Sequence, residues 1–294
     1  MIPRLSRVPL ALASTGLLLA GCARTMESTR FIQFGEGVAI VDRQSQTALA
    51  ESNKLARDVS VERFIRSGAI GLAENSFTVA VDPKDIAAWQ SAFDGIERYA
   101  ALIASLSDAR RQTDAGDAVT ALGAQLNGLG ARISPEVATG FASLAGLIVQ
   151  QKAQRDAVRI IRATDPAIQT ILTQMATALG TDDGSGLRGT VASNWTDSLR
   201  GVREAYVDAA QAKDAAQQRA LIDEYLATLD RRDAQLQALA GLRSSLLSLA
   251  QAHAAEAAEA PASASRLLAL IARQADENER LFDAVKSAQE EGGQ

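Results

Sequence analysis

The chain has one cysteine and one histidine among its 294 residues. A disulfide framework needs paired cysteines, and a zinc site made of Cys and His needs about four such ligands, so both are excluded. Aromatic residues make up only 4% of the chain and the formal net charge is −5, so the basic surface of a nucleic-acid-binding protein is missing. We therefore expect no metal, no cofactor and no nucleic-acid partner, and we assign no catalytic residue.

Alanine is the commonest residue, and it has the highest helix propensity. The hydrophobic fraction of 47% is too high for wholesale disorder. Apolar side chains recur at steps of three and four along most of the chain, and strands do not alternate with helices. The sequence predicts an all-α fold, an elongated antiparallel bundle of long amphipathic helices with coiled-coil-like packing.

The N-terminus carries a targeting signal. Arg4 and Arg7 give a positive start, and residues 8–19 form an apolar run too short to span a bilayer. The following Leu19-Ala20-Gly21-Cys22 resembles the lipobox of bacterial lipoproteins. This resemblance implies cleavage between Gly21 and Cys22 and attachment of a diacylglycerol to the Cys22 thiol.

The resemblance also implies a location in the cell envelope. In Gram-negative lipoproteins, a residue such as Ala23 in place of Asp after the cysteine favours the outer membrane, with the body facing the periplasm. Cleavage removes Arg4 and Arg7 and no acid, which changes the net charge from −5 to −7. Anionic lipid surfaces repel such a body, so we expect the lipid alone to hold the protein on the membrane.

Five segments are expected along the chain. They are the signal peptide at 1–21, the lipidated cysteine with a tether at 22–35, a first helical portion at 36–180, a linker at 181–189 and a second helical portion at 190–290 packed with the first. The linker is rich in Gly, Asp and Ser. In its general sequence pattern, the body resembles uncharacterised all-helical proteobacterial lipoproteins, although no motif identifies a named family.

The first portion is expected to hold five helices. Their predicted ranges are 38–65, about 82–113, 119–133, 134–158 and 164–179. The second, fourth and fifth begin with a capping residue followed by proline, which suits the first turn of a helix. Residues 67–82 are expected to form a packed loop, because a single strand would have nothing to pair with. The polar stripe residues Gln151 and Arg155 either fix helix register or extend into solvent.

The second portion is expected to consist of longer helices. Apolar stripes cover residues 191–209, 222–250 and 267–285, and Pro261 breaks the chain before the last of them. Residues 210–218 are weakly patterned and suit a corner. Because no Pro or Gly interrupts residues 202–240, a single long helix is also possible.

Few residues are candidates for catalysis, metal binding or membrane insertion. His253 lies near a predicted helix end, where a cation is mildly stabilising, and it has no second His or Cys to share a metal or a reaction. The Asp182-Asp183 loop does not have the spacing of an EF-hand. Trp89 and Trp195 fall in apolar stripes, which favours core packing. The apolar run at 137–149 is expected to form a buried helix, the alternative being a tongue that enters a membrane.

The predicted function is that of a non-enzymatic, lipid-anchored interaction or scaffold module. It would present a helix face to an envelope protein, or associate with itself, at a fixed distance from the membrane. Two alternatives are a membrane-active or pore-associated bundle and a ligand-binding envelope sensor. The last requires a sizeable pocket between helices.

The anchor gives a direct prediction. The N-terminal peptide of the protein isolated from its membrane should begin at Cys22 and carry the mass of a diacylglycerol, because the thiol is the acyl acceptor in this signal. Peptide mass spectrometry measures this, and an N-terminal peptide without lipid would contradict the lipobox interpretation.

Overall fold

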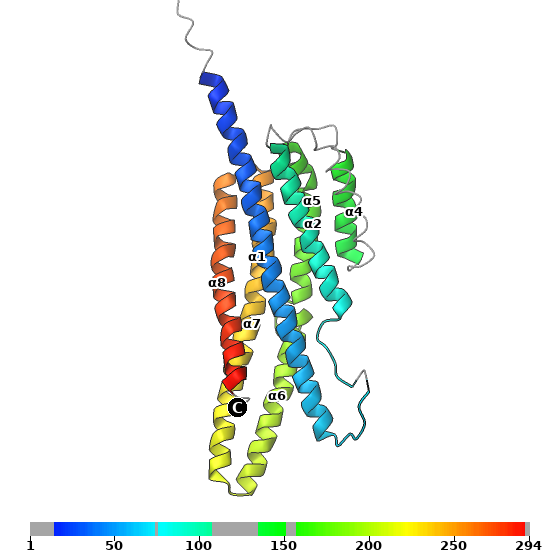
Figure 1. Ribbon diagram of the computed structural model, residues 1–294, viewed down its shortest axis with the longest axis vertical. Helices are drawn as coiled ribbons and strands as arrows, with labels where there is room; N and C mark the ends of the chain where they lie inside the picture. The colour runs from blue at the N-terminus through cyan, green and yellow to red at the C-terminus, as the bar shows by residue number, and fades with distance from the viewer. Residues whose placement is uncertain (1–14, 74–75, 108–134, 151–156, 292–294) are drawn as a thin grey trace, which may run out of the picture.

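The computed structural model describes residues 15–73, 76–107, 135–150 and 157–291. These residues form seven α-helices and no strand, so the all-α, bundle-like fold is confirmed for them. The helices are α1 (Thr15–Arg66), α2 (Pro83–Ser107), α4 (Pro135–Gln150), α5 (Ala157–Leu179), α6 (Gly186–Gln211), α7 (Ala215–Ala257) and α8 (Pro261–Glu291). Figure 1 shows them running along one axis of a long, narrow molecule.

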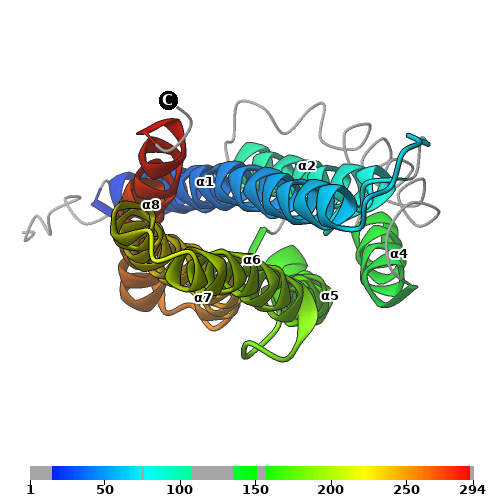
Figure 2. The same cartoon turned by 90° about the horizontal axis from the view of Figure 1, so that it is seen from below.

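The helices form two main layers. Figure 2 shows α1 and α2 in one layer, with α5, α6 and α7 in the other. Helix α8 packs against α7 and α1 at one edge, and α4 packs against α5 at the other. The core lies between the layers, where each helix buries its apolar stripe.

Helix α1 carries the predicted stripe, and every member of that stripe is buried: Val38, Val41, Ser45, Ala48, Ser52, Leu55 and Val59. The predicted start at residue 38 is wrong, because the helix begins at Thr15. Phe31 and Phe34 are buried in the core. Residues 31–35 of the expected tether therefore belong to the packed helix.

The segment after α1 is a loop, as expected. Gly68 has a φ of 68°, which a glycine tolerates without strain as it ends the helix. Further on, the Asn53 side chain of α1 holds the backbone of Val81 with two hydrogen bonds. Asn53 Nδ2 donates to the Val81 carbonyl at 2.9 Å, and the Val81 N–H donates to Asn53 Oδ1 at 2.7 Å. This clamp fixes where the chain enters α2.

The apolar stripes of α2 and α4 are also largely confirmed. The buried members are Phe93, Ile96, Ala100 and Ile103 in α2, and Val137, Phe141, Leu144 and Ile148 in α4. Ile86 and Trp89 are partly buried against the same core. The predicted helix at 119–133 lies outside the described residues, as do Gln151 and Arg155.

Helix α5 corrects the predicted start at Thr164. The helix begins at Ala157, so Pro166 lies inside it rather than in its first turn. Proline has no N–H for the helix and crowds the carbonyl four residues earlier. The buried side chains of Ile160 and Ile161 explain why the helix nevertheless continues through this position. Their packing against the core outweighs the local cost of the proline.

A glycine-dependent loop joins α5 to α6. Gly180 and Gly186 both have positive φ, at 91° and 57°. A Cβ on Gly180 would lie 1.9 Å from the Ser185 carbonyl oxygen, so only glycine fits. Asp182 accepts a hydrogen bond from the Gly184 N–H, and Asp183 pairs with Arg188 of α6.

The chain between residues 202 and 250 forms two helices, not one. Helix α6 ends at Gln211, and α7 begins after Asp214, whose side chain accepts a hydrogen bond from the Gln217 N–H. Lys213 takes a φ of 59° between them. The corner therefore lies within the predicted 210–218 segment, and it depends on an Asp N-cap rather than on Pro or Gly.

Proline at 166 gives a test of this fold. Pro166→Ala should raise the free energy of unfolding by about 1–2 kcal/mol. A proline inside a helix destabilises the folded state by up to about 3 kcal/mol. Its restriction of the unfolded chain stabilises the protein by a smaller amount, so the first effect dominates. Its side chain is exposed, so little packing is lost. Urea denaturation measures the change. Pro261→Ala, at the first position of α8, is the matched control, and it should not raise the free energy of unfolding. A lower stability for Pro166→Ala would contradict an interior position.

Candidate functional site

The lipidation motif lies at the start of α1. The helix includes position 22, while the side chains before residue 29 are outside the described part of the chain. Lipidation at Cys22 and cleavage after Gly21 therefore stay predictions. Figure 1 places this end of α1 beyond the rest of the bundle.

A buried polar network lies at the centre of the bundle. His253 of α7 is fully buried, and its Nδ1 lies 2.7 Å from Asp165 Oδ1 of α5. Its Nε2 lies 2.9 Å from the hydroxyl of Tyr99 in α2. That hydroxyl is also 2.6 Å from Thr164 Oγ1. Three helices are joined by side chains that are far apart in the sequence.

Every polar atom of this network has a partner whether the imidazole is neutral or charged. An ionised Asp165 only accepts, so Nδ1–H of His253 donates to it. With neutral imidazole, Thr164 donates to Tyr99 and Tyr99 donates to Nε2. When Nε2 is protonated, it donates to the Tyr99 hydroxyl, and Tyr99 donates to Thr164. Thr164 then donates to the Ile160 carbonyl at 2.8 Å. The network therefore avoids the cost of an unsatisfied buried group.

The surroundings of the network shift two pKa values. Burial raises the pKa of Tyr99 well above its ordinary value, so the phenol stays protonated. Burial alone would raise the pKa of Asp165. Hydrogen bonds from His253 and Gln169, together with the charge on His253, outweigh that effect and lower it. Asp165 is thus held as a carboxylate.

Aromatic rings pack against the imidazole of this network. The rings of Phe31 and Phe34 lie 6.3 Å and 5.6 Å from His253 between centroids. The arrangement suits a structural role, since the imidazole is fully buried. Sequence reasoning missed it. The sequence correctly placed His253 near a helix end, since α7 ends at Ala257. It wrongly took Thr164-Asp165 as a helix cap, and no local pattern connects either segment to Tyr99.

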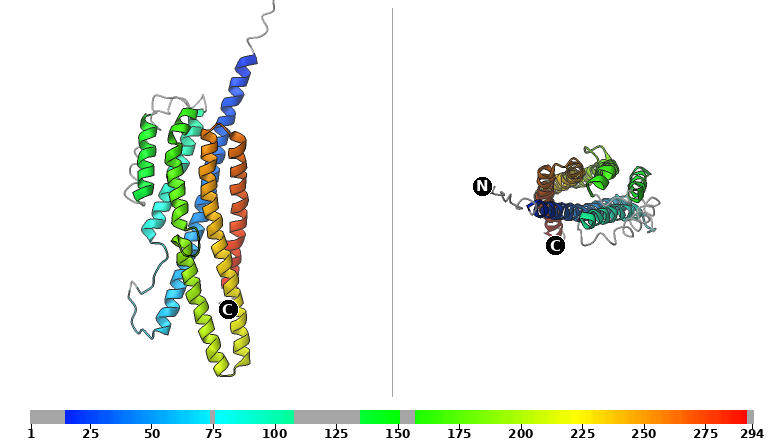
Figure 3. Two further views of the ribbon diagram at one scale, coloured as in Figure 1. Left: turned by 180° about the vertical axis from the view of Figure 1, so that it is seen from behind. Right: turned by 90° about the horizontal axis from the view of Figure 1, so that it is seen from above.

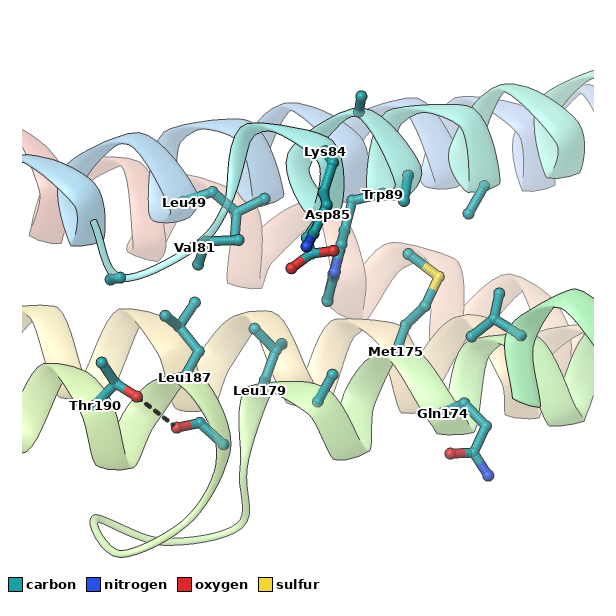
Figure 4. A pocket seen from close by; sticks show the side chains of 17 residues that line it. Leu49, Val81, Lys84, Asp85, Trp89, Gln174, Met175, Leu179, Leu187 and Thr190 are labelled. Atoms are coloured by element: carbon teal, nitrogen blue, oxygen red, sulfur yellow. Dashed lines mark hydrogen bonds between the residues drawn. The ribbon is translucent and has the colours of Figure 1, made fainter. Parts of the chain in front are cut away.

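A cleft opens between the two layers near the start of α2. Its volume is about 840 Å³. We call it the α2–α5–α6 cleft; its lining includes Val81, Lys84, Asp85, Ala87, Trp89, Met175, Ala178, Leu179, Leu187 and Thr190. Figure 4 shows Lys84, Asp85 and Trp89 extending from α2 toward the layer of α5 and α6. Most of the lining is apolar, and the charged groups come from one end of α2.

The two tryptophans have different environments. Trp195 is buried as predicted, and its Nε1 donates to Gln235 Oε1 at 2.7 Å. Trp89 is only partly buried and contributes to the cleft. The sequence predicted no pocket, because the lining of the cleft comes from segments that are far apart in the chain.

Exposed apolar side chains gather at the end of the molecule opposite the start of α1. Apart from Ile32, the large hydrophobic residues exposed in the described part of the chain lie at the end of α1, in the following loop or in the α6–α7 hairpin: Ile65, Ile70, Leu72, Val79, Tyr206, Val207, Ile222 and Leu226. We call these eight residues the distal apolar surface. Figure 3 shows the hairpin extending beyond its neighbours. The predicted stripes at 191–209 and 222–250 placed Tyr206, Ile222 and Leu226 in the core, and these three side chains are exposed instead.

The apolar run at 137–149 is packed in the described structure. Its described large side chains, apart from the partly buried Leu147, are buried against the core. Among the residues that the structure describes, no helix has the length and apolar character needed to cross a bilayer.

Comparison of the chain with protein-family models, with curated proteins and with solved structures finds no match.

The polar network gives a pH-dependent prediction. Asp165→Asn should lower the free energy of unfolding at neutral pH by about 1–2 kcal/mol, because a hydrogen bond to a charged group contributes about 1.5–3 kcal/mol. A carboxyl whose pKa is lowered on folding stabilises the fold above its unfolded pKa, and this contribution is lost as the pH falls through the folded value. The difference in the free energy of unfolding between the two proteins should therefore shrink as the pH falls below about 4. Urea denaturation at several pH values measures it. A gap that persists at about pH 2 would contradict the role of the carboxylate.

Proposed function

We propose that the protein is a lipid-anchored module of the cell envelope that acts by binding rather than by catalysis. Its lipid, on Cys22, would hold the start of α1 at the outer membrane with the body in the periplasm. Its distal apolar surface would contact an envelope protein. The single observation that carries the proposal is the concentration of exposed apolar side chains at the end opposite Cys22.

The position of this surface favours a separate partner over a second copy. Copies anchored in one membrane stand side by side, whereas the distal end faces away from that membrane. Isolated apolar residues on a surface are ordinary, but a group of them on a projecting hairpin is typical of an interaction site. Most side chains from residue 203 to 227 are exposed, so the hairpin is accessible on several sides.

The length of α1 would set the working distance. Its 52 residues span about 78 Å at 1.5 Å per residue. Arg63 and Arg66, near its end, pair with Asp197 at 2.8 Å and Glu204 at 3.1 Å of α6. These pairs join the long helix to the hairpin. A rigid connection between anchor and contact surface is what a spacer requires.

We further propose an antiparallel, coiled-coil-like arrangement of neighbouring helices. Support comes from the short connections, since only residues 212–214 separate α6 from α7 and residues 258–260 separate α7 from α8. The α7–α8 contact is close at Gly241, where an added Cβ would lie 2.3 Å from Asn278 Oδ1.

The burial of His253 supports a role in binding rather than in catalysis. Both ring nitrogens of His253 are engaged inside the bundle, and the imidazole is inaccessible to a substrate. A pore-forming role would require the buried run at 137–149 to leave the core. Its packing makes that costly, which supports the scaffold role over the membrane-active alternative.

Photo-crosslinking in cells tests the proposal. A photoreactive amino acid at Val207 or Leu226 should capture the same envelope protein, and one at exposed Ala272 of α8 should not. Direct binding to that purified protein should weaken at least tenfold with Ile222→Asp and Leu226→Asp together, a loss of about 1.4 kcal/mol or more. Because both side chains are exposed, the fold should persist, as circular dichroism would show.

Two outcomes would overturn this proposal. One is equal capture from position 272 and from the hairpin, which would indicate contact without specificity. The other is capture of a second copy of the chain alone, which would identify the surface as a self-association interface.

A further inference from the structure

We propose that the α2–α5–α6 cleft binds a single-chain zwitterionic phospholipid, with the acyl chain between the helix layers and the head group at Lys84 and Asp85. This inference goes beyond the binding role of the distal surface, and it does not depend on that surface.

The floor and walls of the cleft suit a hydrocarbon chain. Met175, Leu179 and Leu187 are buried side chains that face the opening, and Trp89 forms part of the opposite wall. Among the described residues that line the cleft, Thr190 has the only hydroxyl, and it donates to the Gly186 carbonyl of its own helix at 3.3 Å. The amide of Gln174, also in the lining, points away from α2 (Figure 4). A polar ligand would therefore lose its water without gaining hydrogen bonds along most of the cleft.

The size of the cleft sets the length of the ligand. Its volume of about 840 Å³ lies within the range of small-molecule sites. At about 30 Å³ per carbon, close to the volume of one water molecule in the liquid, a chain of about 16 carbons fills about 480 Å³. The remainder accommodates a glycerol-sized group. Two such chains would not fit.

The charges at the opening select the head group. Lys84 lies between two acids, since its Nζ is 3.5 Å from Asp82 Oδ2 and Asp85 is the next residue. A purely anionic head at Lys84 would also meet the carboxylate of Asp85 in the cleft lining, while Asp82 competes for the same cation. A zwitterionic head matches both signs, with its phosphate at Lys84 and its ammonium at Asp85. Lys84 and Asp85 lie in the first turn of α2, and Asp82 immediately precedes that helix. The Asn53–Val81 clamp holds this end of α2 in place.

Tryptophan fluorescence tests this proposal directly. Full-length protein carrying Cys22→Ser is titrated with lysophosphatidylcholine that is brominated on its acyl chain, below the concentration at which the lipid forms micelles. Bromine quenches an indole only at close range, so emission should fall saturably with one lipid per protein. The quenching should disappear in Trp89→Phe, because the remaining Trp195 is buried between α6 and α7.

Blocking variants separate the cleft from other surfaces. Ala178→Phe places a ring in the cleft from an exposed position, so it should weaken binding at least tenfold without disturbing the core. Ala272→Phe, at an exposed position of α8, is the matched control and should bind as the parent protein does. Circular dichroism checks that both variants fold.

The head-group assignment has its own measurement. A brominated fatty acid with the same chain should bind at least tenfold more weakly than the zwitterionic lipid, and the preference should shrink with Asp85→Asn. Equal binding of the two lipids would overturn the head-group assignment. Quenching that does not saturate, or that persists in Ala178→Phe, would overturn the site itself. Neither result depends on the anchor or on the partner of the distal surface.

Discussion

The close packing along α1 is the constraint on which the rest of the fold depends. This helix contacts α2, α6, α7 and α8, so its stripe must fit several neighbours at once. Small residues meet that demand. Ser45 and Ser52 are buried, and their hydroxyls donate to the carbonyls of Val41 and Ala48 on the same helix. They therefore allow close approach without needing a polar partner from another helix.

A bundle with many Ala and Leu contacts needs something to fix its register, because such stripes fit one another in more than one alignment. The network of Tyr99, Asp165 and His253 supplies this. Its hydrogen bonds form in one alignment of α2, α5 and α7, and sliding any helix by a turn would leave buried polar atoms without partners. The free-energy cost of these lost hydrogen bonds favours one alignment of the three helices over the others. A core built only from aliphatic side chains would lack this selection.

The features that the sequence predicted are those encoded by local spacing. The stripe from Val38 to Val59 repeats at steps of three and four, and one helix suffices to show it. The features that it missed depend on distant segments. The start of α5 required knowing that Ile160 and Ile161 are buried, which outweighs Pro166. The cleft and the His253 network required the relative placement of helices, which no single stretch of sequence contains. The distal position of Tyr206 likewise follows from where the neighbouring helices end.

The distribution of apolar surface ties the proposed roles together. In the proposed role, an acidic body would be repelled by anionic lipids, so it would lie flat on a membrane only at an electrostatic cost. Helix α1 would then keep its far end away from the membrane. Apart from Ile32, the large exposed apolar side chains of the described residues belong to the distal apolar surface, and the cleft offers a second apolar surface. The cleft is concave and narrow, which suits a chain-like ligand, whereas the hairpin is convex and suits a protein. Because the two surfaces differ in shape and lie on different parts of the fold, a lipid and a protein partner can be bound at the same time without competing.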